Sequence, residues 1–295
     1  MTNNSLFIFS PTIKSLNVQN LKNFELIIVD ALYSEGRKLW IEQHSQVPVK
    51  YVNAFPNRYL EKGMVAISSM KNTGIVHSEG ELVIFVDDCT EFPPWWTERL
   101  WKWYVKGYCP MSITKYDVDS HDSREKAVES QGIVHPPGNW FYGGSSDTLQ
   151  NVLTVNGLDE SFDGRKGLED VDLGVRLSML GENYILDREL YHLEYAHVGV
   201  SKNVLTYNGP APICGYAIHL YNTWYCRRYE VNKEVLTLER CNFIRDSICP
   251  KCPIFERCKT ESFKGKFYVE GPGFDTWLSL QETFSLRERI LNEDS

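Results

Sequence analysis

The alternation of apolar and polar positions over the first ninety residues predicts a regular order of elements. Residues 24–30 and 81–88 are continuous aliphatic or β-branched runs that stop on carboxylates, which is typical of strands buried on both faces of a parallel sheet. Between them, apolar residues recur at helical spacing over 57–77. Strand, helix and strand in this order predict a doubly wound α/β sheet.

The rest of the pattern predicts further elements around this unit. Residues 93–108 are rich in tryptophan and predict a helix packed on the sheet, and a second helix is expected from about 168 to 180. The polar stretch 110–140 is interpreted as a long loop, which in a compact domain is usually functional. Short strands are expected at 6–9, 49–52 and 184–186.

Composition narrows the class of protein. With 295 residues, 42% of them hydrophobic, the chain is long enough for one large α/β domain with a small appendage. Its net charge of −8 argues against general nucleic-acid binding through bulk electrostatics. No apolar run approaches the roughly 18 residues of a membrane span, and the first residues lack a basic leader segment. We therefore expect a cytoplasmic protein without a transmembrane segment.

Four of the eight cysteines cluster near the end of the chain, at Cys241, Cys249, Cys252 and Cys258. Their C-x7-C-x2-C-x5-C spacing favours a structural zinc site, whereas an iron–sulfur cluster would need the same four thiolates and unligated cysteines in a small core are the alternative. We therefore expect a main domain over 1–235 and a metal-binding lobe over 236–295. The remaining four are expected to be buried apolar groups: Cys89, Cys109, Cys214 and Cys226.

Carboxylates stand at the ends of the two predicted central strands. Asp30 closes the first, and the pair Asp87 and Asp88 closes the second. Because ligands of doubly wound sheets bind outside the carboxyl ends of the strands, these acids are expected to share one crevice. Adjacent carboxylates suit a divalent cation, although an acid pair at a strand end often only caps a loop.

Three further segments follow one another along the chain: Gly143 and Gly144, then 157–162, then 169–177. They resemble, in the same order, the glycine-rich acceptor-side strand, the G-x-D-E-x-F turn and the E-D-x-D-L-x-x-R helix start of family 2 glycosyltransferases of the GT-A type. The resemblance covers about residues 6–200. The earlier segments that agree in order and spacing are 25–30, 71–74 and 83–94.

The resemblance implies a GT-A fold and a donor site for a nucleotide-diphosphate sugar, UDP-linked by family habit, with Mn²⁺ or Mg²⁺. It implies that Asp30 contacts the nucleobase, that Asp87 contacts ribose or metal, and that Asp88 is a metal ligand. His197 would complete the metal shell, with His192 as the other candidate and a structural histidine as the alternative. The donor-binding residues are Asp30, Lys71, Asp87 and Asp88.

The resemblance also implies an inverting transfer to an acceptor hydroxyl. Asp170 is the expected general base and Glu169 its rival, whereas acids in a first helical turn also serve as caps and dipole partners. Trp140 immediately precedes the glycine-rich strand and is expected on the acceptor side, together with Gly143 and Gly144. The acceptor itself is not identified.

Two departures from the family pattern keep an alternative open. The family often has Asp-x-Asp where this chain has Asp87, Asp88 and Cys89, and a thiol is a poor ligand for Mg²⁺ or Mn²⁺. Only about a dozen residues separate Pro11 from Phe24, so either the first helix is abbreviated or the reading frame begins late. The alternative function is a non-catalytic GT-A-like adaptor whose cysteine-rich lobe docks a partner or nucleic acid.

Overall fold

The protein is described by a computed structural model. The described residues are 9–57, 59–62, 65–116, 123–164, 168–181, 183–195, 218, 238–251, 266–269 and 276–279. The chain divides into two compact units. Unit 1 comprises residues 1–54, 73–157 and 173–200, and unit 2 comprises residues 55–72, 158–172 and 201–295.

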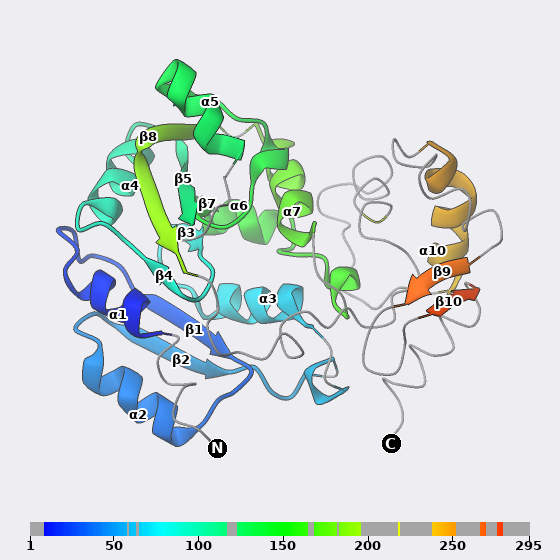
Figure 1. Ribbon diagram of the computed structural model, residues 1–295, viewed down its shortest axis with the longest axis horizontal. Coiled ribbons are helices and arrows are strands. Elements are labelled where there is room, and N and C mark those ends of the chain that lie inside the picture. Colours follow the sequence, from blue (N-terminus) through cyan, green and yellow to red (C-terminus); the bar gives the residue numbers. More distant parts are fainter. Residues whose placement is uncertain are drawn as a thin grey trace. The chain divides into compact units, whose positions relative to one another are not determined.

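Unit 1 is built on a six-stranded mixed sheet with the path β3-β7-β5-β8-β4, with β6 paired to β8 (Figure 1). Strands β5 and β8 are parallel, whereas the other pairs in this sheet are antiparallel. The strands are β3 (Leu82–Phe85), β4 (Thr90–Glu91), β5 (Cys109–Tyr116), β6 (Ile133–Val134), β7 (Ser145–Thr148) and β8 (Tyr184–Glu194).

A second, two-stranded sheet in unit 1 holds the first predicted strand. β1 (Leu26–Asp30) pairs in parallel with β2 (Val49–Asn53), which confirms both predicted strands. Within the described ranges these two strands pair only with each other. The predicted doubly wound arrangement is therefore divided into two sheets, and Asp30 ends a strand of one sheet while Asp87 follows a strand of the other.

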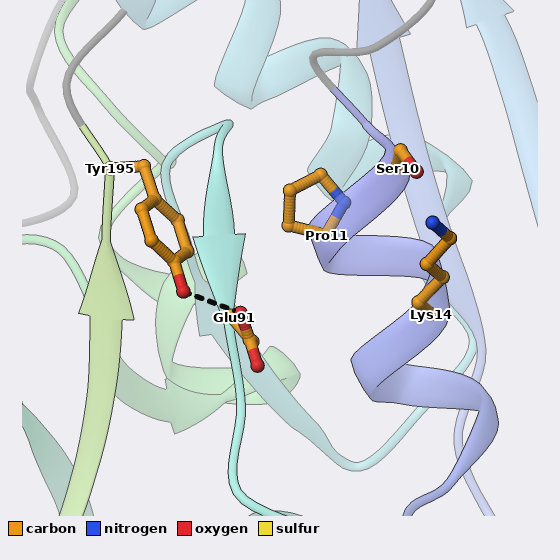
Figure 2. A pocket seen from close by; sticks show the side chains of 5 residues that line it. All are labelled: Ser10, Pro11, Lys14, Glu91 and Tyr195. Atoms are coloured by element: carbon orange, nitrogen blue, oxygen red, sulfur yellow. Dashed lines mark hydrogen bonds between the residues drawn. The ribbon is translucent and has the colours of Figure 1, made fainter.

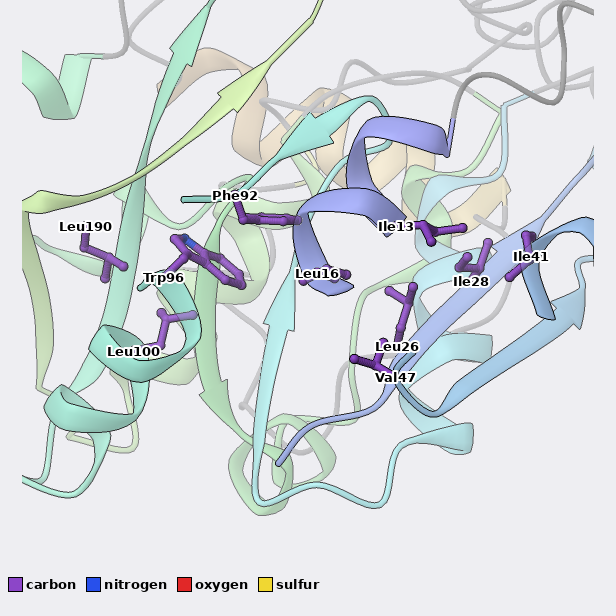
Figure 3. Close-up of a cluster of buried hydrophobic side chains, with 10 residues drawn as sticks. All are labelled: Ile13, Leu16, Leu26, Ile28, Ile41, Val47, Phe92, Trp96, Leu100 and Leu190. Carbon is purple, nitrogen blue, oxygen red and sulfur yellow. The ribbon is translucent and has the colours of Figure 1, made fainter. Parts of the chain in front are cut away.

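Helices α1 (Ser10–Asn17), α2 (Glu35–His44) and α4 (Trp96–Tyr104) share one apolar core with β1. Figure 3 shows Ile13 and Leu16 of α1 between the β1 side chains and the α4 side chains. Each aliphatic side chain removed from water contributes roughly 1.5–3 kcal/mol. The core residues are Ile13, Leu16, Leu26, Ile28, Ile41, Val47, Phe92, Trp96, Leu100 and Leu190. This core joins the two sheets, and α4 confirms a helix packed on the sheet within the predicted range 93–108.

The interpretation of residues 110–140 as a long loop is wrong. Most of the described part of this stretch is β5, α5 (Ser123–Gln131), β6 and the 3-10 helix η3 (Gly138–Trp140). The stretch looked like a loop because its polar residues are buried rather than exposed: Ser112 and Arg124 are 0% exposed and Thr114 is 2% exposed. Their hydrogen bonds within the protein make burial tolerable.

Two other predicted elements differ in length. The helix predicted over 57–77 is a 3-10 turn, η2 (Leu60–Lys62), followed by α3 (Ile67–His77). The strand predicted at 184–186 continues as β8 to Glu194. The remaining helices of this part of the chain are α6 (Leu149–Thr154) and α7 (Glu169–Ser178), which confirms the helix predicted over 168–180.

Unit 2 contains the turn that precedes α7 and the described parts of the C-terminal region. Its elements include η4 (Glu160–Phe162), α10 (Leu238–Phe243), the π-helix η5 (Ile244–Ile248), η6 (Cys249–Lys251) and the antiparallel strands β9 (Lys266–Val269) and β10 (Thr276–Ser279). Ile218 is buried. Cys252 and Cys258 lie outside the described residues, as do residues 6–8 of the first predicted strand. The domain boundary at 235 and the cysteine lobe therefore stay predictions.

Among the residues that the structure describes, no helix has the length and apolar character required to cross a membrane.

Candidate functional site

The acid pair lies in the turn between β3 and β4, and both carboxylates are exposed. Two hydrogen bonds to its backbone carbonyls stabilise the turn. Thr90 Oγ1 donates to the carbonyl of Asp87 at 2.6 Å, and the amide of Tyr195 donates to the carbonyl of Cys89 at 3.1 Å. Cys89 has φ = 56°, in the left-handed region that non-glycine residues rarely adopt. A strained, fixed backbone therefore presents Asp87 and Asp88 to solvent.

Cys89, in contrast to the two acids before it, is buried and only 8% exposed. Burial raises the pKa of its thiol to about 11, and the negative charges of Asp88 and Glu194 act in the same direction. The prediction of a buried cysteine is confirmed here and for Cys109, which is 4% exposed. The side chains that this turn exposes are therefore the carboxylates of Asp87 and Asp88, and not the thiol.

The glycine-rich segment before β7 lies directly against the acid turn. A Cβ atom on Gly143 would be 2.8 Å from Asp87 Oδ2. The amide of Gly144 donates to the carbonyl of Phe85, at the end of β3, at 2.7 Å. The predicted acceptor-side glycines and the predicted donor-side Asp87 are therefore neighbours within unit 1.

Asp30 is 6% exposed and its carboxylate is engaged on both oxygens. Oδ2 accepts from Arg37 Nε at 2.7 Å and from the Tyr51 hydroxyl at 2.6 Å, and Oδ1 accepts from the amide of Leu32 at 2.8 Å. Burial and the hydrogen bond to Asp30 raise the pKa of Tyr51 to about 12. Sequence reasoning found the acid but not Arg37 and Tyr51, which fix its direction.

The second acid cluster occupies the first turn of α7, in unit 2. Glu169 is 6% exposed, whereas Asp170 is partly exposed and its Oδ1 accepts from the amide of Val171 at 2.7 Å. The two predicted candidates for the base thus differ in access to solvent, and Asp170 is the more accessible.

A turn of unit 2 is tied to helix α3, which carries the partly buried Lys71. The next residue, Asn72, exchanges two hydrogen bonds with the backbone of Leu158, both at 2.9 Å. Asp163 accepts from the amides of Ser68 and Ser69 at 2.8 and 3.0 Å and so caps α3 from a distant part of the chain. Nothing local in the sequence indicated these contacts.

Trp140 ends η3 and is partly exposed. Its 3-10 turn crosses α7 where Gly138 meets Gly174, and a Cβ on either glycine would overlap the other's carbonyl oxygen. The two glycines therefore set where the predicted acceptor-side tryptophan lies relative to α7.

His192 is buried at 2% exposure inside unit 1, and its Nδ1 and Nε2 lie 2.8 and 3.1 Å from the hydroxyls of Ser112 and Thr114. This arrangement favours the structural alternative for His192. His197 lies outside the described residues. Among the described residues, no three or more His, Cys, Asp or Glu side chains are grouped so that they could hold a metal ion. The donor-site metal and the cysteine site stay predictions.

A pocket of about 460 Å³ opens between the start of α1 and the pair Glu91 and Tyr195 (Figure 2). One wall carries Glu91, whose Oε2 accepts from the Tyr195 hydroxyl at 2.6 Å, and the other is the start of α1. The lining residues are Ser10, Pro11, Lys14, Glu91 and Tyr195. None of them was predicted as a site residue.

The mixed sheet of unit 1, with exposed acids after β3 and a glycine turn against them, agrees with the GT-A fold that the sequence predicted. The model of the family "Glycosyl transferase family 2" matches residues 8–165, more than half of the chain. The chain belongs to this family. No curated protein sequence matches it.

Solved structures give the same class of fold at low sequence identity. Residues 1–349 of S. aureus TarS in complex with UDP-GlcNAc superpose with a TM-score of 0.57 and 13% identity, covering 85% of this chain and 74% of that one. A mannosyltransferase from Pyrobaculum calidifontis, PcManGT, in complex with GDP-Man and Mn²⁺, gives a TM-score of 0.50 and 12% identity, covering 90% and 73%. Against a longer S. aureus TarS structure this chain spans 35% of the length.

Proposed function

We propose that the chain is a glycosyltransferase that moves a sugar from a nucleotide-diphosphate donor to an acceptor hydroxyl with inversion. The observation that carries the proposal is the family match over the segment that holds Asp30, Lys71, Asp87 and Asp88. The similar proteins were solved with UDP-GlcNAc, UDP, or GDP-Man and Mn²⁺, which supports a nucleoside-diphosphate donor. A UDP-sugar is the first candidate.

The donor side is assigned to the exposed turn after β3. Carboxylate oxygens suit Mn²⁺ or Mg²⁺ better than a thiol does, so Asp88 is assigned as the metal ligand, with Asp87 contacting ribose or metal. A bound divalent cation would neutralise the charge of the departing pyrophosphate. The ammonium of Lys71 would add to this stabilisation.

Asp30 is assigned to contact the nucleobase through its Oδ1 atom. Its Oδ2 already accepts from Arg37 and Tyr51, so the contact has to come from Oδ1, which accepts one backbone amide. Carboxylate oxygens accept two hydrogen bonds readily. Arg37 and Tyr51 hold the carboxylate in place before the donor arrives, which reduces the ordering cost of binding.

Asp170 is assigned as the general base because it is more accessible than Glu169. Its carboxylate takes the proton of the acceptor hydroxyl while that oxygen bonds to the anomeric carbon from the face opposite the leaving group. The bond from the anomeric carbon to the pyrophosphate oxygen breaks, and the nucleoside diphosphate leaves with the electron pair. Trp140 offers an aromatic face to the acceptor.

The test is a panel of UDP-, GDP- and TDP-sugars offered to the purified protein with and without EDTA. We expect release of one nucleoside diphosphate, loss of that release with EDTA, and loss of turnover with retained nucleotide binding in Asp170→Asn. Glu169→Gln is the matched control and should keep measurable turnover. Calorimetry that shows no binding of any donor would instead favour the adaptor alternative, which the cysteine beside the acid pair motivates.

A further inference from the structure

A buried arginine lies behind the glycine turn. Arg124 comes from α5 and is 0% exposed. A guanidinium in a protein interior loses its hydration, and this cost has to be offset by hydrogen bonds and by neighbouring groups that favour its charge. Its surroundings therefore indicate what it holds.

The guanidinium binds the glycine turn at three places. Nη2 donates to the carbonyl of Gly143 at 2.9 Å, Nη1 donates to Ser145 Oγ at 3.4 Å, and the guanidinium carbon lies 3.8 Å from the centre of the Tyr142 ring. Ser145 Oγ also accepts from the amide of Tyr142 at 3.0 Å. One side chain thus engages Tyr142 and Gly143 of the turn and Ser145, the first residue of β7.

The other side of the turn rests on a buried histidine. Gly144 has φ = 80°, and a Cβ atom there would overlap His192 Cε1. Arg124 Nη2 also donates to Thr114 Oγ1 at 3.1 Å, and the same hydroxyl lies 3.1 Å from His192 Nε2. Arg124 and His192 therefore share one hydroxyl and enclose the turn between them.

This turn limits the positions open to the Asp87 carboxylate, because Asp87 Oδ2 lies 2.8 Å from the place where a Cβ atom of Gly143 would be. We propose that Arg124 is a positioning residue that holds the Gly143–Gly144 backbone against Asp87 and so fixes the direction of that carboxylate. The inference rests on the proposed function only in taking Asp87 as a donor-site acid. Arg124 itself is not placed in contact with the donor.

The first test measures the turn without any ligand. Arg124→Lys keeps the charge but loses the planar fork of donors. We expect the Gly144 amide, bonded to Phe85 O, to exchange with solvent about tenfold faster in the variant. The Leu149 amide, bonded to Glu81 O at the other end of the β3–β7 pair, is the internal control and should not change. Unchanged exchange at Gly144 would overturn the inference.

The second test is a double-mutant cycle of Arg124 and Asp87. The quantity compared is the affinity for Mn²⁺ with UDP, which calorimetry measures. Arg124→Lys is expected to weaken binding about tenfold, and Asp87→Asn is expected to cost much less in the Arg124→Lys background than alone. Additive losses would mean that Arg124 acts independently of Asp87, which contradicts the proposal. Arg99→Lys, which alters the pair with Asp187, is the matched control and should leave binding unchanged.

The two tests separate this inference from the proposed function. If the unmodified protein binds no Mn²⁺ with UDP, the donor assignment fails, whereas amide exchange still decides whether Arg124 holds the turn. If Arg124→Lys does not fold, Tyr142→Leu removes the ring under the guanidinium and leaves the hydrogen bonds. Tyr142→Leu should also make the Gly144 amide exchange faster, by a smaller factor than Arg124→Lys. Unchanged exchange would count against the proposal.

Discussion

The backbone of Gly138 packs directly on the backbone of Gly174, where the segment leading to β7 crosses α7. A Cβ atom on Gly174 would overlap Phe141 Cβ and the Gly138 carbonyl oxygen. Neither glycine is needed for an unusual φ, since neither has a positive one. Both are therefore required by close approach, and this contact fixes the turn that carries Trp140.

The first prediction is that Gly174→Ala destabilises the protein by about 2 kcal/mol, because the added methyl group has no space and the crossing has to separate. The free energy of unfolding in urea measures it. Gly36→Ala is the control, since Gly36 also lies in a helix but has nothing within 4 Å of its Cβ position. That variant should gain up to about 1 kcal/mol from helix propensity, and equal effects at both positions would contradict the close approach.

The second prediction separates backbone strain from steric overlap at Gly144. Gly107 and Gly144 have φ of 85° and 80°, but only Gly144 faces His192. Gly107→Ala should cost about 1 kcal/mol from the left-handed backbone alone. Gly144→Ala should cost about 1–3 kcal/mol more, again measured in urea. Equal costs would show that the His192 contact contributes nothing.

Local pattern was sufficient for the elements that are apolar in sequence. β1 was predicted from a continuous aliphatic run, β2 from the short segment 49–52, and α4 from the tryptophans gathered around Leu100. β5 was missed because Ser112 and Thr114 occupy positions where apolar residues are expected. Their burial depends on His192, about 80 residues away in sequence, which no local pattern can indicate.

In the candidate site, too, features visible in the local sequence were predicted and features that depend on distant residues were missed. Asp30, Asp87 and Asp88 were found because a strand that ends on a carboxylate is a local feature. Tyr51 became a partner of Asp30 only through the β1–β2 pairing, which places it opposite Ile28. Arg124 was missed because charged residues are usually exposed, and its burial is visible only once the turn before β7 is placed.

The third prediction concerns pH and Asp163. Burial raises the pKa of this carboxyl from 3.8 to about 7, although the hydrogen bonds from Ser68 and Ser69 oppose the shift. The folded state therefore binds more protons than the unfolded state between these two values, so its stability falls as pH rises from about 4 to about 7, by up to ~1.4 kcal/mol per pH unit. Urea denaturation at several pH values measures this slope, and Asp163→Asn should flatten it.

Asp187 provides a control of opposite sign. Burial acts to raise its pKa, but Arg99, the amide of Glu189 and Trp103 outweigh burial and lower it. The stability that Asp187 contributes is therefore present above the unfolded pKa and lost as the pH falls through the folded one. Asp187→Asn should reduce stability at neutral pH and leave the slope between about pH 4 and 7 intact. A slope unchanged by Asp163→Asn would remove Asp163 as its source.

The fourth prediction concerns an ion pair within unit 2, between helix α10 and Asp159 of the segment that resembles the G-x-D-E-x-F turn. Arg240 Nη2 of α10 lies 3.2 Å from Asp159 Oδ2, and the Asp159 side chain is 0% exposed. Arg240→Met should cost about 3 kcal/mol, because it removes a charged hydrogen-bond partner of a buried carboxylate. The double variant Arg240→Met with Asp159→Asn should recover part of this loss in urea denaturation. Additive costs would mean that the pair does not interact.

The last prediction uses the contact between Gly143 and Asp87 to test the donor site. A methyl group on Gly143 would lie 2.8 Å from Asp87 Oδ2, the far end of an exposed side chain that can move aside. Gly143→Ala should therefore change the free energy of unfolding by less than about 0.5 kcal/mol. Because the carboxylate is displaced, the variant should bind Mn²⁺ with UDP about tenfold more weakly, measured by calorimetry.

Gly80→Ala is the matched control for this variant. Gly80 precedes β3, and its Cβ position has only an ordinary contact, 3.7 Å from the carbonyl oxygen of Leu82. Both stability and binding should be unchanged in this variant, because nothing has to move. If Gly143→Ala binds Mn²⁺ with UDP as tightly as the unmodified protein does, Asp87 contributes no oriented ligand and Asp88 alone carries the donor contact. A large loss of stability would instead mean that the added methyl group disturbs the turn itself and not only the Asp87 carboxylate.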